Sequence, residues 1–555
     1  MSITPAWLEH AVFYQIYPQS FADADGDGIG DLQGIIDRLD YLAALGVTAL
    51  WINPIYDSPF LDAGYDVRDH FRVADRYGSN EDVRRLCAAA HERGIRVCLD
   101  LVVGHTALDH PGFVASARPE HNEWSDRFVW SDNPWMVRDR DLTFISGTTD
   151  RMGAYAVNFF AHQPALNFGF AEPRRPWQQR PDAPGPTANR QMIRDILAFW
   201  FEHGVDGFRV DLAASLVKAD PQQVMVRMLW RELRDWLDTT WPDRVLISEW
   251  GDPARAVEAG FHIDFMLHFG TPGYPELMFN GHGMARIRSG VEHCWFDRRG
   301  LGDFRHFLVP FEQQRHALAG RGAVGLPSAN HDFQRPRVGD RELDDLRVIL
   351  TFLLSWPGVP FVYYGDEIGM RFLELPSKEG GYQRTGTRTP MQWDAGPNAG
   401  FSTAAPEQLY LPVDPAPDRP DVASQRADPE SLWQQVRRLI QLRREEPALA
   451  ASASLRLLSS GAHLPLVFVR GQAGSRLLVV LSPAAGERSF DLPADCVLRE
   501  SLLARGVRIA GEGEGEGEEE KGEGKGKAEA DPPRVRLRLD GPAAGIWRLA
   551  GGAEP

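Results

Sequence analysis

The sequence predicts an α/β fold, a (β/α)8 TIM barrel with a domain inserted after the third strand and a C-terminal antiparallel β-sandwich domain. Eight apolar, β-rich runs alternate with helical patterns over the first three-quarters of the chain. A long polar stretch interrupts this series, and short alternating strands follow it. The 555 residues also exceed one core of ordinary size, so several domains are expected.

The barrel strands are predicted, in chain order, from the apolar runs. Each run is rich in β-branched or aromatic residues, and helical patterns separate the runs, as a parallel barrel requires. The runs are VFYQIYP from Val12, ALWINPI from Ala49, IRVCLDLVV from Ile95, VDGFRVD from Val205, RVLISEW from Arg244, FHIDFML from Phe261, GAVGLPSANHD from Gly322 and GVPFVYYGDE from Gly358. Residues 1–103 and 171–450 are therefore assigned to the barrel, domain A.

Two further regions are predicted outside the barrel. Residues 104–170 show little regular periodicity and are expected to form a small inserted domain B over one barrel face. Residues 451–555 carry alternating runs such as LPLVFVRG and SRLLVVLS, which predict the C-terminal β domain. Within that domain, residues 511–533 form a Gly/Glu/Lys tract with almost nothing to bury, which predicts a disordered loop.

Composition narrows the classes of partner. A formal net charge of −17 disfavours phosphate backbones and anionic lipid, so neither a nucleic acid nor a membrane is expected as partner. No apolar run approaches the about 18 to 20 residues of a membrane span, and the N-terminus lacks the pattern of a secretory signal. Four scattered cysteines suit a reducing compartment. We expect a cytoplasmic protein with a neutral small-molecule substrate; its oligomeric state stays open.

Carboxylates gather where the predicted strands end, and in a parallel barrel these ends form the active-site face. The polar residues at strand ends are Asp100 and His105 on the third strand, Arg209 and Asp211 on the fourth, Glu249 on the fifth, and His331 and Asp332 on the seventh. A helix cap or a salt bridge would explain any single acid equally well. Four acids that converge on one mouth indicate a catalytic site instead.

Glycosidic bond cleavage needs a carboxylic acid that protonates the departing oxygen and a carboxylate that meets the oxocarbenium-like carbon. Asp211 and Glu249 are the predicted pair. Arg209 lies two residues earlier on the same strand face and would hold Asp211 ionised. Other anions and Trp250 surround Glu249, so its pKa should be raised and it should begin the cycle protonated.

Four segments make the sequence resemble the α-amylase family, glycoside hydrolase family 13, over essentially the whole chain. They are DLVVGH from Asp100, GFRVDLAAS from Gly207, ISEW from Ile247 and SANHD from Ser328. The resemblance implies that Asp211 is the nucleophile, Glu249 the acid/base and Asp332 the carboxylate that binds sugar hydroxyls. It also implies that His105 and His331 donate hydrogen bonds to the glucose on the non-reducing side of the cleavage point.

Two more segments resemble α-glucosidases, oligo-1,6-glucosidases and trehalose synthases. They are DAGYDVRD from Asp62 and TRTPMQWD from Thr387. By this resemblance Tyr65 stacks on the sugar ring, while Asp62 and Arg388 close the pocket around a terminal glucose and make the enzyme exo-acting. With Arg209, these residues complete the expected substrate site. For Arg388, an ion pair with a structural acid is the alternative.

The loop DADGDGIGD, from Asp23, spaces oxygen ligands at alternate positions around glycines, as calcium loops do. The predicted ligands are the side chains of Asp23, Asp25, Asp27 and Asp31 and the backbone carbonyl of Ile29. By resemblance the ion is Ca²⁺ or Mg²⁺, structural and remote from catalysis. A plain Asp/Gly turn without metal is the alternative. No organic cofactor is expected.

The sequence departs from the family pattern at three places. Gly104 stands where Asn is usual, Ala165 stands where Asp is usual, and LAAS after the nucleophile lacks the Lys-His pair of true α-amylases. These departures disfavour both the amylase calcium site and the binding of long starch. Leu212, which follows the nucleophile, leaves the linkage preference open.

The leading expectation is a retaining exo-α-glucosidase that acts on short oligosaccharides or disaccharides through a covalent glucosyl intermediate on Asp211. A transglucosylase or isomerase such as a trehalose synthase would share every catalytic residue. A non-catalytic scaffold, similar to the family-related transporter heavy chains, is the alternative of another class. The retained acids and the absence of an apolar anchor in the sequence oppose it.

Overall fold

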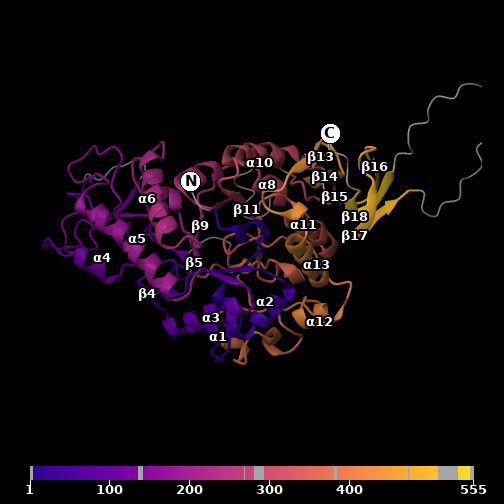
Figure 1. Ribbon diagram of the computed structural model, residues 1–555. Helices are drawn as coiled ribbons and strands as arrows, with labels where there is room; N and C mark the ends of the chain where they lie inside the picture. Colours follow the sequence, from indigo (N-terminus) through magenta and orange to yellow (C-terminus); the bar gives the residue numbers. More distant parts are fainter. Residues whose placement is uncertain are drawn as a thin grey trace, which may run out of the picture.

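The computed structural model describes residues 4–135, 142–267, 269–279, 293–379, 384–472, 474–510 and 535–550. The barrel forms the middle of the molecule (Figure 1). The region around α4 (Pro111–Ser116) lies at one end, and the C-terminal strands lie at the other. Among the described residues, no helix combines the length and apolar character needed to cross a bilayer. All four cysteines are buried and form no disulfide.

Eight parallel strands close the barrel, and each lies within one of the predicted apolar runs. They are β1 (Phe13–Ile16), β2 (Ala49–Ile52), β5 (Arg96–Leu101), β8 (Gly207–Val210), β9 (Val245–Ser248), β10 (Ile263–Phe265), β11 (Ala323–Pro327) and β12 (Val359–Tyr363). The hydrogen-bonded order is β1-β12-β11-β10-β9-β8-β5-β2, and β1 pairs with β2 to close the ring. The predicted (β/α)8 barrel is confirmed.

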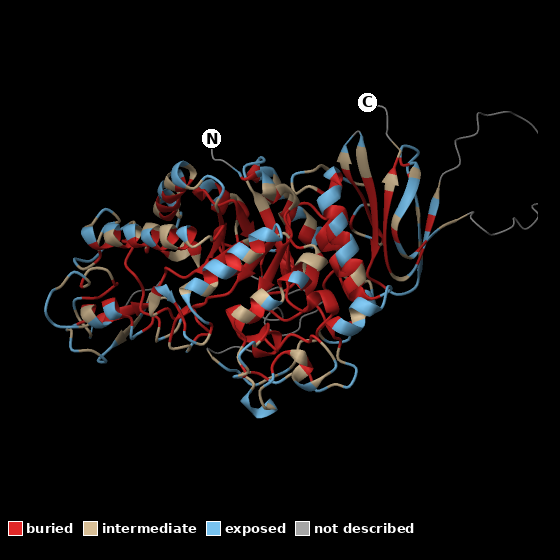
Figure 2. Cartoon of the chain, turned by 60° about the horizontal axis from the view of Figure 1, so that its bottom comes forward, coloured by how far each residue is buried: buried red, intermediate tan, exposed pale blue. Residues whose placement is uncertain are grey.

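Helices cover the outside of the barrel with one apolar face turned inward, as the red inner and blue outer faces in Figure 2 show. The helices of the barrel region are α1 (Leu32–Asp37), α2 (Leu39–Leu45), α3 (Asn80–Glu92), α5 (Pro184–Glu202), α6 (Val224–Thr240), α7 (Pro253–Ala259), α8 (Tyr274–Met278), α10 (Arg305–Leu318), α11 (Leu343–Ser355), α12 (Val422–Ala427) and α13 (Leu432–Glu445). Helix α6 buries Val226, Leu229, Trp230, Leu233 and Leu237, a helical spacing. Each such side chain contributes roughly 1.5 to 3 kcal/mol on burial.

Domain B lies between β5 and β8. It contains α4 and an antiparallel pair, β6 (Thr143–Ser146) with β7 (Ala154–Val157). Its aromatic side chains build a small core, in which Phe113 packs against Trp130 and Tyr155 with ring centroids 5.8 and 5.0 Å apart. The backbone N–H of Leu166 donates to the Gly104 carbonyl at 3.1 Å, so the end of the insertion returns to the point where it began.

The C-terminal region is antiparallel, as predicted. Its strands are β13 (Leu455–Leu457), β14 (Leu466–Gln472), β15 (Ser475–Ser482), β16 (Glu487–Asp491), β17 (Leu498–Ile509) and β18 (Arg536–Leu549). All six strands belong to one hydrogen-bonded sheet, and the long β18 joins its parts. The first half of β18 pairs with β16, its second half pairs with β15, and β17 pairs with it along both halves. Apolar residues of both halves pack into one cluster. The predicted loop 511–533 lies outside the described residues.

The other face of this sheet packs on the barrel. Phe468 of β14 meets Trp356, which follows α11, with ring centroids 5.1 Å apart. Arg470, also of β14, is fully buried and donates to the carbonyl of Ser355 at 2.5 Å. The C-terminal domain therefore supports the barrel at α11, and its strands contribute none of the predicted catalytic residues.

Candidate active site

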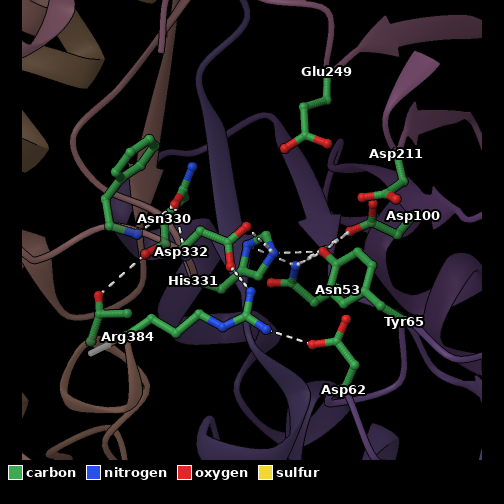
Figure 3. Close-up of polar contacts among 12 residues, drawn as sticks. Asn53, Asp62, Tyr65, Asp100, Asp211, Glu249, Asn330, His331, Asp332 and Arg384 are labelled. Atoms are coloured by element: carbon green, nitrogen blue, oxygen red, sulfur yellow. Dashed lines mark hydrogen bonds and ion pairs between the residues drawn. The ribbon is translucent and has the colours of Figure 1, made fainter. Parts of the chain in front are cut away.

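The two predicted catalytic carboxylates lie side by side at the carboxyl end of the barrel (Figure 3). Asp211 directly follows β8, and Glu249 directly follows β9. In the parallel register Val210 is the partner of Ser248, and the backbone N–H of Glu249 donates to the Val210 carbonyl at 3.0 Å. The ladder therefore brings both acids to the same level on neighbouring strands.

Arg209 joins these acids to a third carboxylate. Its Nη1 lies 2.9 Å from Asp211 Oδ1 and 2.6 Å from Asp100 Oδ1, and its Nη2 lies 2.7 Å from Glu249 Oε1. The expected contact with Asp211 is present, and the contact with Glu249 is an addition. The Asp100 side chain has no exposed area, whereas those of Asp211 and Glu249 are 10% and 9% exposed. Asp100 therefore orients Arg209, while the other two acids can reach a substrate.

Burial raises the pKa of Asp211 well above its usual value, and the neighbouring charge of Glu249 adds to this rise. Burial also raises the pKa of Glu249, while Arg209 opposes the rise in both groups. The backbone N–H of Leu212 donates to Glu249 Oε2 at 3.0 Å. Two interacting carboxyl groups beside one shared cation titrate as a pair, so protonation of one lowers the pKa of the other.

Asp332 enters the site after β11, two strands along the ring from β9. Its Oδ1 lies 2.5 Å from Arg384 Nη1 and 3.2 Å from Arg388 Nη2. Burial works against its ionisation, but the neighbouring His331 and the two arginines hold the pKa of Asp332 well below its usual range. Its side chain is 23% exposed, more than those of Asp211 and Glu249. Asp332 is thus an ionised carboxylate that faces open space in the site.

His331 is a neutral hydrogen-bond donor. Burial lowers its pKa well below the usual value. Its Nδ1 faces the amide NH₂ groups of Gln15 and Asn53 at 3.0 and 3.2 Å, and both of these are donors. The proton therefore belongs on Nε2, which lies 2.7 Å from the Tyr65 hydroxyl and 3.3 Å from Asp332. The predicted hydrogen bond from His331 to a sugar hydroxyl would use this N–H, and it stays a prediction.

Tyr65 and His105 are both held by other residues of the chain. The Tyr65 hydroxyl donates to Asp100 at 3.1 Å, and its ring stacks on that of His331 with centroids 5.2 Å apart. His105 Nε2 lies 2.9 Å from the Tyr65 carbonyl, and its Nδ1 lies 3.2 Å from Asn158. Burial lowers the pKa of His105 to about 4. A sugar hydroxyl would have to replace one of these partners, so the predicted sugar contacts of the two residues stay predictions.

Asp62 and Arg388, the two residues predicted to close the pocket, form their ion pairs with other residues, and their role around a terminal glucose stays a prediction. Asp62 forms its ion pair with Arg384 and accepts a hydrogen bond from Gln163 at 2.7 Å. Arg388 instead donates to the His331 carbonyl at 2.8 Å and contacts Asp332. Arg384 bridges Asp62 and Asp332, as Figure 3 shows. Arg384 is therefore an additional cation of the site, beside Arg388.

The predicted metal loop brings three carboxylates together. Asp23, Asp25 and Asp27 have ligand atoms within 4.8 Å of one another. Carboxylate oxygens suit a hard cation such as Ca²⁺ or Mg²⁺, so this donor set fits the predicted ion. Asp31 accepts from the backbone N–H of Gly34 at the start of α1 and from that of Ala24. It acts as a helix cap, and the ligand roles of Asp31 and Ile29 stay predictions.

A lysine lies where domain B meets the barrel. Lys218 Nζ donates to the Ser215 carbonyl at 2.6 Å and to Asn158 Oδ1 at 3.2 Å, and burial lowers its pKa to about 8. Asn158 also lies over Gly104, because a Cβ atom at Gly104 would come within 2.7 Å of its amide nitrogen. A side-chain cation therefore occupies the region where the sequence lacks the usual calcium ligands Asn and Asp.

Several residues of the site are not predicted from the sequence pattern. Asn53 directly follows β2, so the strand-end rule that identifies Asp211 would also have indicated it. Arg384 and Gln163 belong to loops without periodicity, and their contacts with Asp62 span more than a hundred residues. The Leu212 N–H is a backbone group, to which sequence patterns give no signal.

Comparisons with known proteins agree with this geometry. The sequence profile described as "Alpha amylase, catalytic domain" matches residues 15–452. The chain is similar to trehalose synthase/amylase TreS of Mycobacterium tuberculosis, with 32% identity over 85% of this chain and 80% of the relative. It is also similar to oligo-1,6-glucosidase of Heyndrickxia coagulans, with 30% identity over 88% of this chain and 94% of the relative.

A solved structure matches the fold along its whole length. The trehalulose synthase MutB from Pseudomonas mesoacidophila MX-45 superposes with a TM-score of 0.77 and 25% identity, covering 98% of this chain and 99% of that one. The same protein has been solved as an inactive double mutant in complex with isomaltulose, with a TM-score of 0.78. The fold and the order of domains are therefore those of enzymes that process glucosides.

Proposed function

This chain is an enzyme of the α-amylase family, and from that premise we propose that it is a retaining, exo-acting α-glucosidase that hydrolyses short α-glucosides. One observation carries the proposal: Arg209 holds Asp211 and Glu249 together, while the charge of the ionised Asp332 acts on Glu249. Retaining cleavage requires two adjacent carboxyl groups that share one proton. A scaffold protein would need neither this pair nor its charge balance.

In the proposed mechanism, the proton of the pair resides on Glu249, because the charge of an ionised Glu249 is one cause of the raised pKa of Asp211 and protonation of Glu249 removes that cause. Asp211 Oδ attacks C1 of the glucose as Glu249 protonates the glycosidic oxygen, so the C1–O bond breaks and the aglycone leaves as an alcohol. Glu249 then removes a proton from a water molecule, whose oxygen attacks C1 and releases Asp211 as a carboxylate. Two inversions at C1 retain the anomeric configuration. Asp332 accepts hydrogen bonds from sugar hydroxyls and strengthens them at the transition state.

Arg384 supports the exo-acting part of the proposal. It ties Asp62, next to Gln163 of domain B, to Asp332 on the barrel wall. Both carboxylates accept hydrogen bonds and so can bind the hydroxyls of a terminal sugar ring, and their fixed spacing leaves less room for a second sugar unit beyond it. The pocket would therefore admit one non-reducing glucose.

We expect the substitution Arg384→Ala to lower kcat/KM for a disaccharide by about 10- to 100-fold, because hydrogen bonds to charged groups contribute roughly 1.5 to 3 kcal/mol. Arg384→Lys should recover only part of this loss, since an ammonium group cannot bridge two carboxylates as a guanidinium does. Arg371→Ala is the matched control, because Arg371 also bridges two acids, Asp414 and Asp418, in another part of the chain. Equal kinetics for the Arg384 and Arg371 variants would contradict the role of Arg384.

A second candidate function has a specific basis. The similar proteins include trehalose synthase/amylase TreS and the trehalulose synthase MutB, whose names denote formation of a disaccharide. Such an enzyme would share Asp211 and Glu249, and a sugar hydroxyl in place of water would intercept the glucosyl ester. The catalytic residues therefore suit both outcomes.

Product analysis separates the two functions. Purified protein is incubated with maltose, isomaltose, sucrose and trehalose, and the products are resolved by chromatography over time. Glucose, released first as its α-anomer, is the expected result for a retaining hydrolase. A new disaccharide with little glucose would establish the isomerase instead. With maltotetraose, glucose and maltotriose should be the first products, and early maltose would contradict exo action.

We also propose that Asp23, Asp25 and Asp27 hold a structural Ca²⁺ or Mg²⁺ ion. The support is the cluster of three carboxylates in one loop, where an ion would offset their mutual repulsion. The ion would brace the loop between β1 and α1. The two catalytic carboxylates lie instead after β8 and β9. It would therefore affect stability more than the chemical step.

We expect the melting temperature to fall when the protein is treated with EDTA and to recover when Ca²⁺ is added. An ion at 100 times its Kd stabilises the folded state by about 2.7 kcal/mol. Asp25→Asn should abolish the response, because it removes a charge but keeps the acceptor for the Asp27 N–H. Asp40→Asn, at an exposed acid that pairs with Arg93, is the control. Identical melting curves with EDTA and with Ca²⁺ would refute the metal site.

A further inference from the structure

A buried acid lies on the strand next to the one that carries Glu249. Asp264 is the middle residue of β10 and has no exposed area. In the parallel register it is the partner of Ser248, the last residue of β9. The neighbours of Asp264 in its own strand, Ile263 and Phe265, belong to the hydrophobic core. A carboxyl group in such surroundings costs several kcal/mol of solvation free energy unless its hydrogen bonds compensate.

The hydrogen bonds of Asp264 go to the two residues that flank Glu249 in the chain. Its Oδ1 accepts from Ser248 Oγ at 2.6 Å and from the backbone N–H of Trp250 at 2.9 Å. Burial raises the pKa of Asp264 to about 7, while these donors and the backbone N–H of Asp252 lower it. One carboxyl group thus holds both residues that flank Glu249.

The carboxylate of Glu249 is held separately at its other end. Arg209 Nη2 lies 2.7 Å from Oε1, and the backbone N–H of Leu212 donates to Oε2 at 3.0 Å. Both of these contacts come from β8 or the residues directly after it, whereas Asp264 comes from β10 on the other side of β9. The Glu249 carboxylate is therefore held from one neighbouring strand, and the residues on either side of Glu249 are held from the other.

We propose that Asp264 is a positioning residue for the acid/base Glu249. It fixes the residues on either side of Glu249, and so sets the direction from which the Glu249 proton approaches the glycosidic oxygen. The proposal rests on the proposed function, because it concerns the acid step of that mechanism. A misplacement of about 1 Å at a reacting group can lower a rate about 100-fold, so the positions of Ser248 and Trp250 matter for catalysis.

A positioning role and a merely structural role predict different rates for substrates with different leaving groups. Protonation by Glu249 is essential when a sugar alkoxide departs, but fluoride leaves with little help. Loss of Asp264 should therefore slow a disaccharide substrate far more than α-glucosyl fluoride. A purely structural defect would reduce the amount of folded enzyme and lower both rates by the same factor.

The test compares kcat/KM for α-glucosyl fluoride with that for whichever of maltose, isomaltose, sucrose and trehalose the wild type processes fastest. In Asp264→Ala we expect the disaccharide value to fall about 100-fold, within the range that general acid catalysis contributes, and the fluoride value to fall less than about fivefold. Asp264→Asn keeps an acceptor and should recover most of the loss. Ser248→Ala removes one hydrogen bond with little change in volume and should shift the ratio in the same direction.

Glu367→Gln is the matched control. Glu367 is also fully buried, burial raises its pKa to about 7, and it accepts from the hydroxyls of Tyr14 and Tyr41. This variant should leave the ratio of the two substrates unchanged. If Asp264→Ala and Ser248→Ala leave the ratio at the wild-type value, the positioning role is overturned; if Asp264→Ala does not fold, an unchanged ratio in Ser248→Ala alone overturns it. If the wild type acts on neither class of substrate, the proposed function falls first, and this inference falls with it.

Discussion

Replacement of Asp211 by alanine or asparagine should lower kcat/KM for a disaccharide by at least about 10⁴-fold, the scale on which loss of one member of a catalytic unit acts. The reason is chemical. Asp211 supplies the oxygen that bonds to C1, and neither replacement offers a charged oxygen. Arg209 would remain paired with Asp100 and Glu249, so the fold should tolerate the change. Steady-state kinetics with the purified variants measure the loss.

A labelling experiment identifies the nucleophile directly. With 5-fluoro-α-glucosyl fluoride, wild-type enzyme should accumulate a glucosyl ester, and mass spectrometry of a peptide digest should place the added mass on Asp211. Asp211→Asn should remain unlabelled. Asp252→Asn is the control, because this acid lies near the same barrel face but caps α7. A label on any other residue would disprove the assignment of the nucleophile.

The second large effect is expected for Glu249→Gln. This variant cannot protonate the leaving group, so kcat/KM for a disaccharide should fall about 10²- to 10⁴-fold. With α-glucosyl fluoride the first step should survive, and added azide should restore turnover by attacking the glucosyl ester without a general base. The product would be α-glucosyl azide, which chromatography and nuclear magnetic resonance can identify.

The pH dependence gives an independent check on Glu249. Burial raises its pKa, and the mechanism needs its protonated form. Wild-type activity on a disaccharide should therefore persist below the raised pKa and decline as pH rises through it. In Glu249→Gln this decline should vanish. Glu258→Gln, at a side chain that is 54% exposed and pairs with Arg227, should keep the wild-type profile. A decline that survives in Glu249→Gln would assign the titration to another group.

Much of the barrel can be predicted from the sequence because its signals are local. Each strand needs a short apolar run, and all eight runs became strands of one closed barrel. The positions of Asp211 and Glu249 follow for the same reason, since both directly follow a strand and parallel strands share one edge. In the C-terminal domain, the quoted apolar runs predict β14 and β15. The pairing of β18 with both β15 and β16 could not be predicted, because the partners of one long strand depend on distant segments.

The misses all concern contacts between residues far apart in the chain. The resemblance indicated Asp62 and Arg388 but not Arg384, four residues earlier in the same loop, which forms the ion pair with Asp62. Asp264 stands out in the sequence as an acid within an apolar run, but its hydrogen-bond partners depend on which strand lies beside β10. Only the register of β9 with β10 shows that it meets Ser248 and Trp250.

By itself, the sequence determined the order of the elements, the barrel, and which carboxylates stand at its mouth, because covalent order and hydrophobic periodicity act over a few residues. The tertiary structure decided how charge is shared there. Arg209 serves three acids, and Asp332 receives two arginines. Electrostatic interactions depend on distances of a few ångströms between segments that only the closed barrel brings together, so their pairing and their effects on pKa follow from the fold.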